Sequence, residues 1–283
     1  MICTLLALYS IINYRRLVVK IGVFDSGSGG LTVLRELEKT LPGNEYVYFG
    51  DFLRVPYGDK PREKIVQYST EIARFLEDQG VEMIVVACNT VVANAMDELK
   101  AMCNVPVVGV IDPTIEYVAK QGYSNVGVAA TAATVNSEVY KKGLAGHGID
   151  STSVACSDFV SLIEANKLEK ELDISIERYF GNFVGKDIQA VVLGCTHYPI
   201  IREKLQNYLN KKGEKIELVD PAIHTVNHIA EITSEDEKQS ESVKKTKFWF
   251  GKVDESLLKR ASEIMGKTVD ASRHSFEMDG TIK

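Results

Sequence analysis

Short apolar runs rich in β-branched residues alternate along the chain with longer amphipathic stretches. In residues 62–78, for example, Ile65, Ile72 and Phe75 fall on one face of a predicted helix. The run at 83–87 is apolar throughout, which suits a strand covered on both sides. The pattern predicts an α/β fold with mostly parallel sheets. Strands are expected at 18–24, 45–50, 82–88, 105–110, 125–130, 187–195 and 215–219.

The C-terminal part of the chain departs from this alternation. Residues 232–247 are polar and rich in charge, which predicts a solvated linker. The run at 247–251 predicts a further strand, and residues 254–266 predict a helix with Asp254 as its N-cap. Because this tail carries aromatic and leucine side chains that need burial, it must pack on the preceding part of the chain.

Two parts of the chain repeat the same order of features at nearly the same intervals. The order is a glycine within a strand, a cysteine, and an Asp-Pro pair: Gly22, Cys88 and Asp112 in the first part, and Gly127, Cys195 and Asp220 in the second. The agreement of both intervals predicts two similar α/β units, each with a cysteine at the end of a central strand.

Charge and cysteine content narrow the class of protein. The net charge of -6 argues against nucleic acid or an anionic membrane surface as the main partner, and leaves small polar substrates open. The five cysteines form no C-x-x-C motif, which indicates reduced cytosolic thiols. The apolar start is too short to span a bilayer, and its basic pair follows the apolar run. Residues 1–17 are therefore interpreted as an extension before the folded sequence.

Cys88 and Cys195 each lie where a predicted strand gives way to a helix. Ligands bind outside the carboxyl ends of strands in open α/β sheets, and a helix N-terminus favours a thiolate. A free cysteine is often only a small buried hydrophobe, and this interpretation is kept for Cys103 and Cys156. Two cysteines at equivalent positions favour a matched pair of active-site thiols.

Polar residues near these thiols could assist them. Asp25 ends a strand and opens a glycine-rich loop at 25–31, whose backbone N–H groups could hold an anion or simply form a tight turn. Its carboxylate could position or deprotonate one thiol. His197 follows Cys195 closely and could serve the other. The sequence supplies no cluster to complete a Cys-x-His metal site, so no metal is expected. The loop at 54–60 could contact a ligand or be a plain turn.

Together these motifs resemble the glutamate racemase family, within the wider group of cofactor-independent Asp/Glu racemases. The resemblance extends from about residue 20 to 232. It rests on IGVFDSGSGGLTVL, VPYGDK, ACNTVVA, FVSLIE and LGCTHYPII. It implies two α/β domains that face each other across a cleft, and an isomerase that interconverts L- and D-glutamate without pyridoxal phosphate. It also implies a cytoplasmic homodimer that supplies D-glutamate for bacterial peptidoglycan and cell shape.

The resemblance also implies roles for individual residues. Cys88 and Cys195 would be the acid/base thiols, Asp25 would assist the first, and His197 with Glu164 would assist the second. Periodicity alone would leave Glu164 on a solvated helix face. Substrate contacts would come from Asp25, Ser26, Tyr57, Gly58, Asn89, Thr90, Thr131 and Thr196.

Two departures from the family pattern stand near these residues. Ala130 precedes Thr131 where the family usually has glycine, and the segment before Glu164 lacks the usual prolines. The domains implied are 18–114 with 225–283, and 115–224, because the family's tail returns to its first domain.

Two thiols suit the inversion of an α-carbon, because one removes the proton from one face while the other supplies a proton to the opposite face. The carbanion would be stabilised by backbone N–H groups and the Asn and Thr side chains after each cysteine. Three alternatives stay open. They are an aspartate racemase or related isomerase, a two-lobed small-ligand binding protein with structural thiols, and a Cys–His hydrolase, which would leave the second cysteine unexplained.

Overall fold

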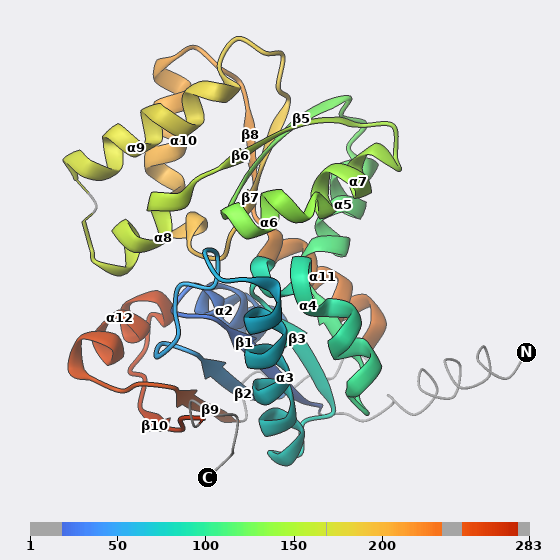
Figure 1. Cartoon of the computed structure of the whole chain (residues 1–283), viewed down its shortest axis with the longest axis vertical. Helices are drawn as coiled ribbons and strands as arrows, with labels where there is room; N and C mark the ends of the chain where they lie inside the picture. Colours follow the sequence, from blue (N-terminus) through green and yellow to red (C-terminus); the bar gives the residue numbers. More distant parts are fainter. Residues whose placement is uncertain (1–18, 168, 234–244, 277–283) are drawn as a thin grey trace, which may run out of the picture.

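The computed structural model describes residues 19–167, 169–233 and 245–276. The predicted extension at 1–17 and most of the predicted linker lie outside these residues. The described part of the chain forms two sheets, and all their strand pairs are parallel. Figure 1 shows the two sheets with their helices, one above the other. The predicted α/β fold is confirmed.

The first sheet has six strands in the order β10-β9-β2-β1-β3-β4. Its strands are β1 (Lys20–Asp25), β2 (Glu45–Gly50), β3 (Met83–Val86), β4 (Val107–Gly109), β9 (Lys245–Phe250) and β10 (Ala271–Arg273). The helices connected to it are α2 (Gly30–Thr40), α3 (Arg62–Asp78), α4 (Asn89–Met102), α5 (Ile111–Lys120), α11 (Pro221–Thr233) and α12 (Glu255–Met265). We call this part the first domain. Helix α3 packs against α4, and α2 packs against α11 and α12.

The second sheet has four strands in the order β6-β5-β7-β8 and defines the second domain. Its strands are β5 (Asn125–Ala130), β6 (Asp150–Ala155), β7 (Ala190–Gly194) and β8 (Glu217–Val219). Its helices are α6 (Ala132–Ser137), α7 (Val139–Ala145), α8 (Ser157–Glu164), α9 (Lys170–Phe180) and α10 (Arg202–Lys211), with short 3-10 turns η1 (Gly181–Phe183) and η2 (Tyr198–Ile201).

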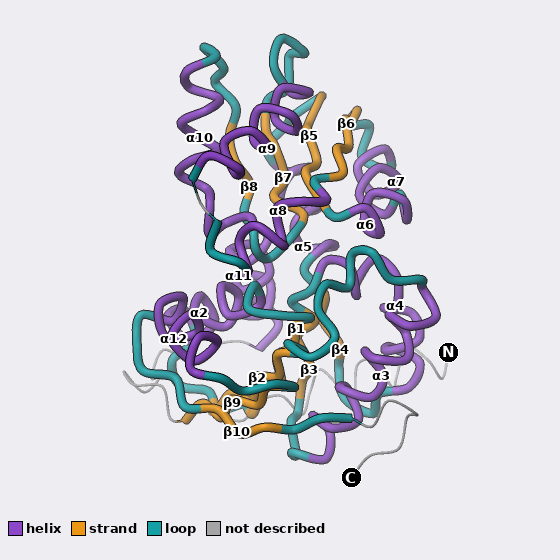
Figure 2. The backbone as a smooth tube through the Cα atoms, turned by 60° about the vertical axis from the view of Figure 1, so that its left-hand side comes forward, coloured by secondary structure: helices purple, strands orange, loops and turns teal. Residues whose placement is uncertain are grey.

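The C-terminal segment completes the first sheet. Strand β9 pairs with β2 along its whole length, and β10 adds the outer edge (Figure 2). Helix α12 begins as predicted, because the Asp254 side chain accepts a hydrogen bond from the Leu257 backbone N–H at 3.0 Å. The predicted linker at 232–247 is wrong at both ends, since α11 continues through Thr233 and β9 already begins at Lys245.

Two observed strands are absent from the sequence prediction. Strand β6 has the sequence DSTSVA and is nowhere fully buried, and β10 spans only Ala271–Arg273. Both are edge strands, and neither has a fully buried residue that would require an apolar side chain. Apolar periodicity therefore gives too weak a signal to identify them.

The chain crosses between the two sheets through α5 and α11, which pack against each other (Figure 1). The predicted domain limits at 114/115 and 224/225 fall inside these two helices and stay predictions. One hydrophobic core surrounds the first sheet and continues through α5 and α11 onto one face of the second. A second core fills the opposite face of that sheet. None of the described helices combines the length and apolar character needed to cross a membrane.

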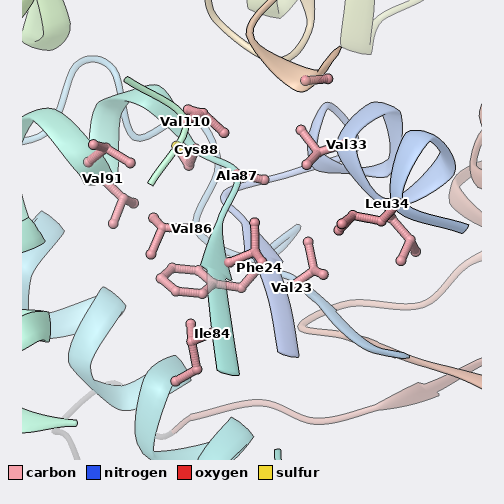
Figure 3. Packing of buried hydrophobic residues seen from close by; sticks show 14 of the residues in the cluster. Val23, Phe24, Val33, Leu34, Ile84, Val86, Ala87, Cys88, Val91 and Val110 are labelled. Carbon is pink, nitrogen blue, oxygen red and sulfur yellow. The ribbon is translucent and has the colours of Figure 1, made fainter. Parts of the chain in front are cut away.

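The register of the strands places the candidate site residues at the carboxyl ends of the strands in each of the two sheets. Asp25 is level with Gly50, and Phe24 is level with Val86, so the carboxyl ends of β1 and β3 coincide. In the second sheet the ends of β5 and β7 coincide in the same way. Figure 3 shows the buried side chains of β1, β3, α2 and α4 that gather near Cys88. This packing fixes the strand end from which the Cys88 thiol projects.

Candidate active site

The two thiols lie at the carboxyl ends of β3 and β7 and line one shared cavity. Cys88 is 5% exposed and Cys195 is 6% exposed. The cavity is narrow, with a volume of about 20 Å³ for the centre of a water-sized sphere. It is lined by Ser26, Pro56, Tyr57, Gly58, Asp59, Cys88, Asn89, Thr90, Thr131, Ala132, Ser157, Val160, Cys195, Thr196 and His197. Residues from both domains therefore form a single site.

The surroundings of Cys88 favour the thiol. Burial raises the pKa of Cys88 to about 12, and the charge of Asp25 adds to this effect. A hydrogen bond with the Ser26 hydroxyl, at 3.5 Å from Sγ, acts in the opposite direction. The N-terminus of α4 favours the thiolate as expected, through the Val91 backbone N–H, but burial and the charge of Asp25 outweigh this effect.

Asp25 lies beneath the cavity and is fully buried. One carboxylate oxygen accepts a hydrogen bond from the Gly27 backbone N–H at 2.9 Å, and the other from the Thr196 hydroxyl at 3.1 Å. Burial raises the pKa of Asp25, although the charge of His197 lowers it in part. Asp25 thus links the loop after β1 to the loop that carries Cys195.

The surroundings of Cys195 differ from those of Cys88. Its sulfur lies 3.8 Å from His197 Nδ1, and His197 Nε2 lies 2.6 Å from Glu164 Oε1. The sequence predicts a helix directly after Cys195, but the short 3-10 turn η2 follows instead, and α10 begins only at Arg202. The thiol of Cys195 therefore has the His197 ring beside it in place of a helix N-terminus.

His197 and Glu164 form a buried ion pair. Burial by itself would lower the pKa of His197, but hydrogen bonds with Cys195 and Glu164 and the charge of Glu164 raise it well above its ordinary value. Burial would likewise raise the pKa of Glu164, yet the hydrogen bond from His197, together with Ser28 and Arg260, lowers it to about 2. At neutral pH the imidazolium therefore donates to both the Glu164 carboxylate and the Cys195 sulfur.

The polar side chains beyond the thiols form a connected wall of the cavity. The Thr90 and Thr131 hydroxyls lie 2.9 Å apart, and Thr131 caps α6. The departure at Ala130 leaves Thr131 at the strand end, so its hydroxyl reaches the cavity. Asn89 accepts a hydrogen bond from the Tyr140 hydroxyl at 2.7 Å, while its buried Nδ2 has no partner. A buried amide N–H₂ without a partner is suited to an acceptor on a ligand.

Tyr57 lines the cavity, but its hydroxyl donates to Asp51. Arg54 Nε also binds Asp51, at 2.6 Å, and Arg54 Nη1 binds Glu71. The structure thus anchors the tip of the loop at 54–60 through a buried network. Sequence reasoning missed this network, because its members are separated in the chain.

The glycine-rich loop after β1 passes very close to the second domain. A Cβ at Gly29 would lie 2.3 Å from Thr196 Oγ1 and 2.6 Å from His197 Nδ1. A Cβ at Gly30 would lie 2.3 Å from the Asp25 Cβ. Glycine is therefore needed at these positions because neighbouring side chains occupy the space of a Cβ. The sequence pattern alone could not distinguish this need for space from a tight turn.

The structure brings the predicted site residues together, all but two of them on the cavity wall. Asp25 lies beneath the wall, and Glu164 lies behind His197. Ser28 and Arg260, which both bind Glu164, were not predicted. Ser28 lies in the recognised glycine-rich motif and could have been considered, whereas nothing in the local pattern marks Arg260.

The remaining described cysteines lie outside this cavity. Cys156 is fully buried in the core of the second domain, as its interpretation as a small hydrophobe requires. Cys103 is only half-buried and ends α4. Within residues 19–167, 169–233 and 245–276, no group of three His, Cys, Asp or Glu side chains is arranged to hold a metal ion.

Fold and site define a two-domain α/β protein in which each domain delivers one thiol to a common cavity. The chain belongs to the Asp/Glu/Hydantoin racemase family, whose model matches residues 21–229. The resemblance inferred from the motifs is thereby confirmed, and the family is one of racemases.

Known proteins similar to this chain are called glutamate racemases. The protein from Aquifex aeolicus is 38% identical over 254 residues, which cover 89% of this chain and 96% of that protein. The protein from Aquifex pyrophilus is 44% identical over 204 residues, which cover 71% of this chain and 78% of that protein. The glutamate racemase from Francisella tularensis, solved in complex with D-glutamate, has a TM-score of 0.82 and 31% identity, with 93% of this chain and 99% of that chain covered.

Proposed function

We propose that the protein interconverts L- and D-glutamate by moving the α-proton between the substrate and the thiols of Cys88 and Cys195. The observation that carries the proposal is that these two thiols come from different domains and line one cavity. The names of the relatives supply the substrate, since the Francisella tularensis structure is described as a glutamate racemase in complex with D-glutamate.

The proton transfer requires one thiolate and one thiol at the start. Cys195, next to the protonated His197, would begin as the thiolate and take the α-proton from one face. Cys88, whose surroundings favour the thiol, would donate its proton to the opposite face. The substrate keeps its composition and changes only its handedness. The reverse reaction begins with the proton on Cys195 and the thiolate at Cys88.

The carbanion needs stabilisation from groups placed before the reaction begins. The unpaired Asn89 Nδ2 and the Thr90 and Thr131 hydroxyls supply donors on one side of the cavity. Backbone N–H groups at the start of α4 lie on the same side and favour a carboxylate. These groups support a substrate carboxylate bound next to Cys88, and the mechanism needs no pyridoxal phosphate or metal.

Exchange of the α-proton with solvent tests the proposal. Purified protein without added cofactor is incubated with L-glutamate in D₂O, and loss of the α-proton signal is followed by NMR. The unaltered protein should exchange the proton and form D-glutamate. Cys88→Ala and Cys195→Ala should each reduce racemisation by about 10³-fold or more, because either change removes one base. Cys103→Ala, which changes a thiol outside the cavity, is the matched control.

Two results would contradict this proposal. Binding of glutamate without α-proton exchange would instead indicate a small-ligand binding protein. Turnover by Cys88→Ala or Cys195→Ala at more than a tenth of the unaltered rate would rule out the two-base mechanism. The same assay with L-aspartate decides between glutamate and the alternative of an aspartate racemase, since the preferred substrate must exchange faster.

The wider role is inferred from the family resemblance. We place the protein in the cytoplasm as a homodimer that supplies D-glutamate for bacterial peptidoglycan. The described cysteines are free thiols, which suits a reducing compartment. Growth of a D-glutamate-requiring bacterial strain that carries the gene would test the role, and sedimentation of the purified protein would test the dimer.

A further inference from the structure

The carboxylate of Glu164 is shared among partners from both domains. Its Oε1 accepts hydrogen bonds from His197 Nε2 at 2.6 Å, from the Ser28 hydroxyl at 2.7 Å and from the Ser28 backbone N–H at 3.2 Å. Its Oε2 accepts one from Arg260 Nη1 at 2.8 Å. Arg260 therefore binds the oxygen that the other partners leave free.

These partners come from distant parts of the sequence. Glu164 is the last residue of α8 in the second domain, and Ser28 lies in the loop after β1. Arg260 lies on α12, which packs against α2 of the first domain. Figure 1 shows α12 below α8 on the left-hand side of the view. The C-terminal segment thus contacts the second domain at Glu164, the residue that binds His197.

Arg260 is a partly buried cation on α12. Its side chain is 17% exposed, and Glu164 is the ion-pair partner that the described residues provide. The adjacent Lys259 is exposed on the same helix. A partly buried ion pair is screened less than a surface pair, and the planar guanidinium fixes the direction of the bond.

We propose that Arg260 is a positioning residue for the Cys195 half of the site, because it holds Glu164 in the orientation that directs His197 at the Cys195 sulfur. The proposal rests on the proposed racemase function. Without Arg260, Glu164 keeps partners on one oxygen only, so the carboxylate can rotate about its terminal bond. His197 then loses the fixed partner that sets its ring plane, and the distance from Nδ1 to Cys195 varies.

The kinetic test compares Arg260→Gln with Lys259→Gln, which removes the same charge from the same helix. We expect kcat/KM to fall by about 10- to 100-fold in Arg260→Gln, because small displacements of a catalytic group are costly. Most of this loss should appear in kcat, and Lys259→Gln should stay within twofold of the unaltered protein. Arg260→Lys should recover part of the activity, since it restores the charge without the fork geometry.

An isotope effect distinguishes positioning of one thiol from general loosening of the fold. L- and D-glutamate have equal free energies, so kcat/KM falls equally in both directions. The α-deuterium effect, however, should rise only in the direction in which Cys195 removes the proton. His197→Asn should raise the effect in that same direction, and Ser26→Ala, beside Cys88, in the opposite one. Equal increases in both directions would overturn the proposal.

A second measurement does not depend on activity. The ¹⁵N resonances of His197, assigned from their loss in His197→Asn, should move in Arg260→Gln and stay in Lys259→Gln. Unchanged resonances in a folded Arg260→Gln protein would overturn the proposal even if racemisation is reduced. If the resonances move in Arg260→Gln but the unaltered protein exchanges no α-proton of glutamate, the positioning role of Arg260 is supported and the proposed racemase function is refuted.

Discussion

Cys88 and Cys195 occupy equivalent places in two similar domains, but their charged neighbours differ. Cys88 is buried close to Asp25, and two acidic groups buried together hold one negative charge more easily than two. Burial raises the pKa of Cys88 most, and the charge of Asp25 raises it further. Cys195 instead contacts the protonated His197. The two thiols therefore face different charged groups, a carboxylate and an imidazolium.

Glu164 should make the stability of the protein depend on pH in the acid range. Its pKa is lowered from 4.5 to about 2, so its contribution is fully present above about pH 4.5 and is lost as the pH falls toward 2. The shift corresponds to at most about 3 kcal/mol of the free energy of unfolding. Urea unfolding at pH 6 and at pH 3 should therefore show a larger loss of stability in the unaltered protein than in Glu164→Gln.

His197 acts in the opposite pH direction. Because its pKa is raised above 6.5, its contribution is present below that value and is lost as the pH rises through the pKa of the folded state. The pair is thus most stabilising between about pH 4.5 and 6.5. An equal acid sensitivity of Glu164→Gln and the unaltered protein would contradict the inferred ion pair.

At the scale of elements, the loop between β1 and α2 decides how closely the domains approach. Gly29 has the ordinary helical angles φ -59 and ψ -37, so any residue could adopt its conformation. The lack of space next to Thr196 and His197 explains the glycine instead. The same loop supplies Ser28 to Glu164. This one segment therefore contacts the Cys195 half of the site directly.

Gly29→Ala should fold and lose activity. The added Cβ would displace Thr196 or His197, and a shift of about 1 Å can reduce kcat/KM by about 100-fold. Gly181→Ala is the matched control, because Gly181 also has helical angles and its Cβ would meet only the Tyr208 hydroxyl, at 3.3 Å. Steady-state kinetics would compare kcat/KM of the two variants, and urea unfolding would show whether both are folded. Full activity of Gly29→Ala would show that the site tolerates the displacement.

For the whole molecule, the spatial order of the strands in the first sheet differs from their order along the chain. The first sheet takes its last two strands from the end of the chain, after the second domain has been completed. The same segment contributes Arg260 to the Glu164 carboxylate. The fold of the first domain and one part of the site therefore both depend on the C-terminal segment.

Phe250→Ala should destabilise the first domain. Phe250 is fully buried at the end of β9, and its ring lies 4.6 Å from that of Phe52 and 6.3 Å from that of Tyr48. Loss of such a ring from a core costs about 3–5 kcal/mol. Leu53→Ala, at a side chain that is 47% exposed, should change the free energy of unfolding by less than about 1 kcal/mol. Urea unfolding would compare the two, and similar losses would show that β9 adds little to the core.

The amino-acid sequence by itself determined those features that depend on neighbours in the chain. Apolar runs gave the central strands, helical spacing gave α3, and a single side chain gave the start of α12. The two matching cysteines could be placed at strand ends for the same reason. These signals arise within a few residues, so they can be read before the chain is folded.

Only the tertiary structure decided which of these residues meet and what charge they carry. The edge strands β6 and β10 lack an apolar pattern and depend on the neighbouring strand. Arg260 and Glu164 lie far apart in the sequence and come together only when α12 packs on α2. The raised pKa of Cys88 likewise requires burial and Asp25 together. Contacts between distant segments and removal from water have no local signature, and they separate two similar strand-end cysteines into two different thiols.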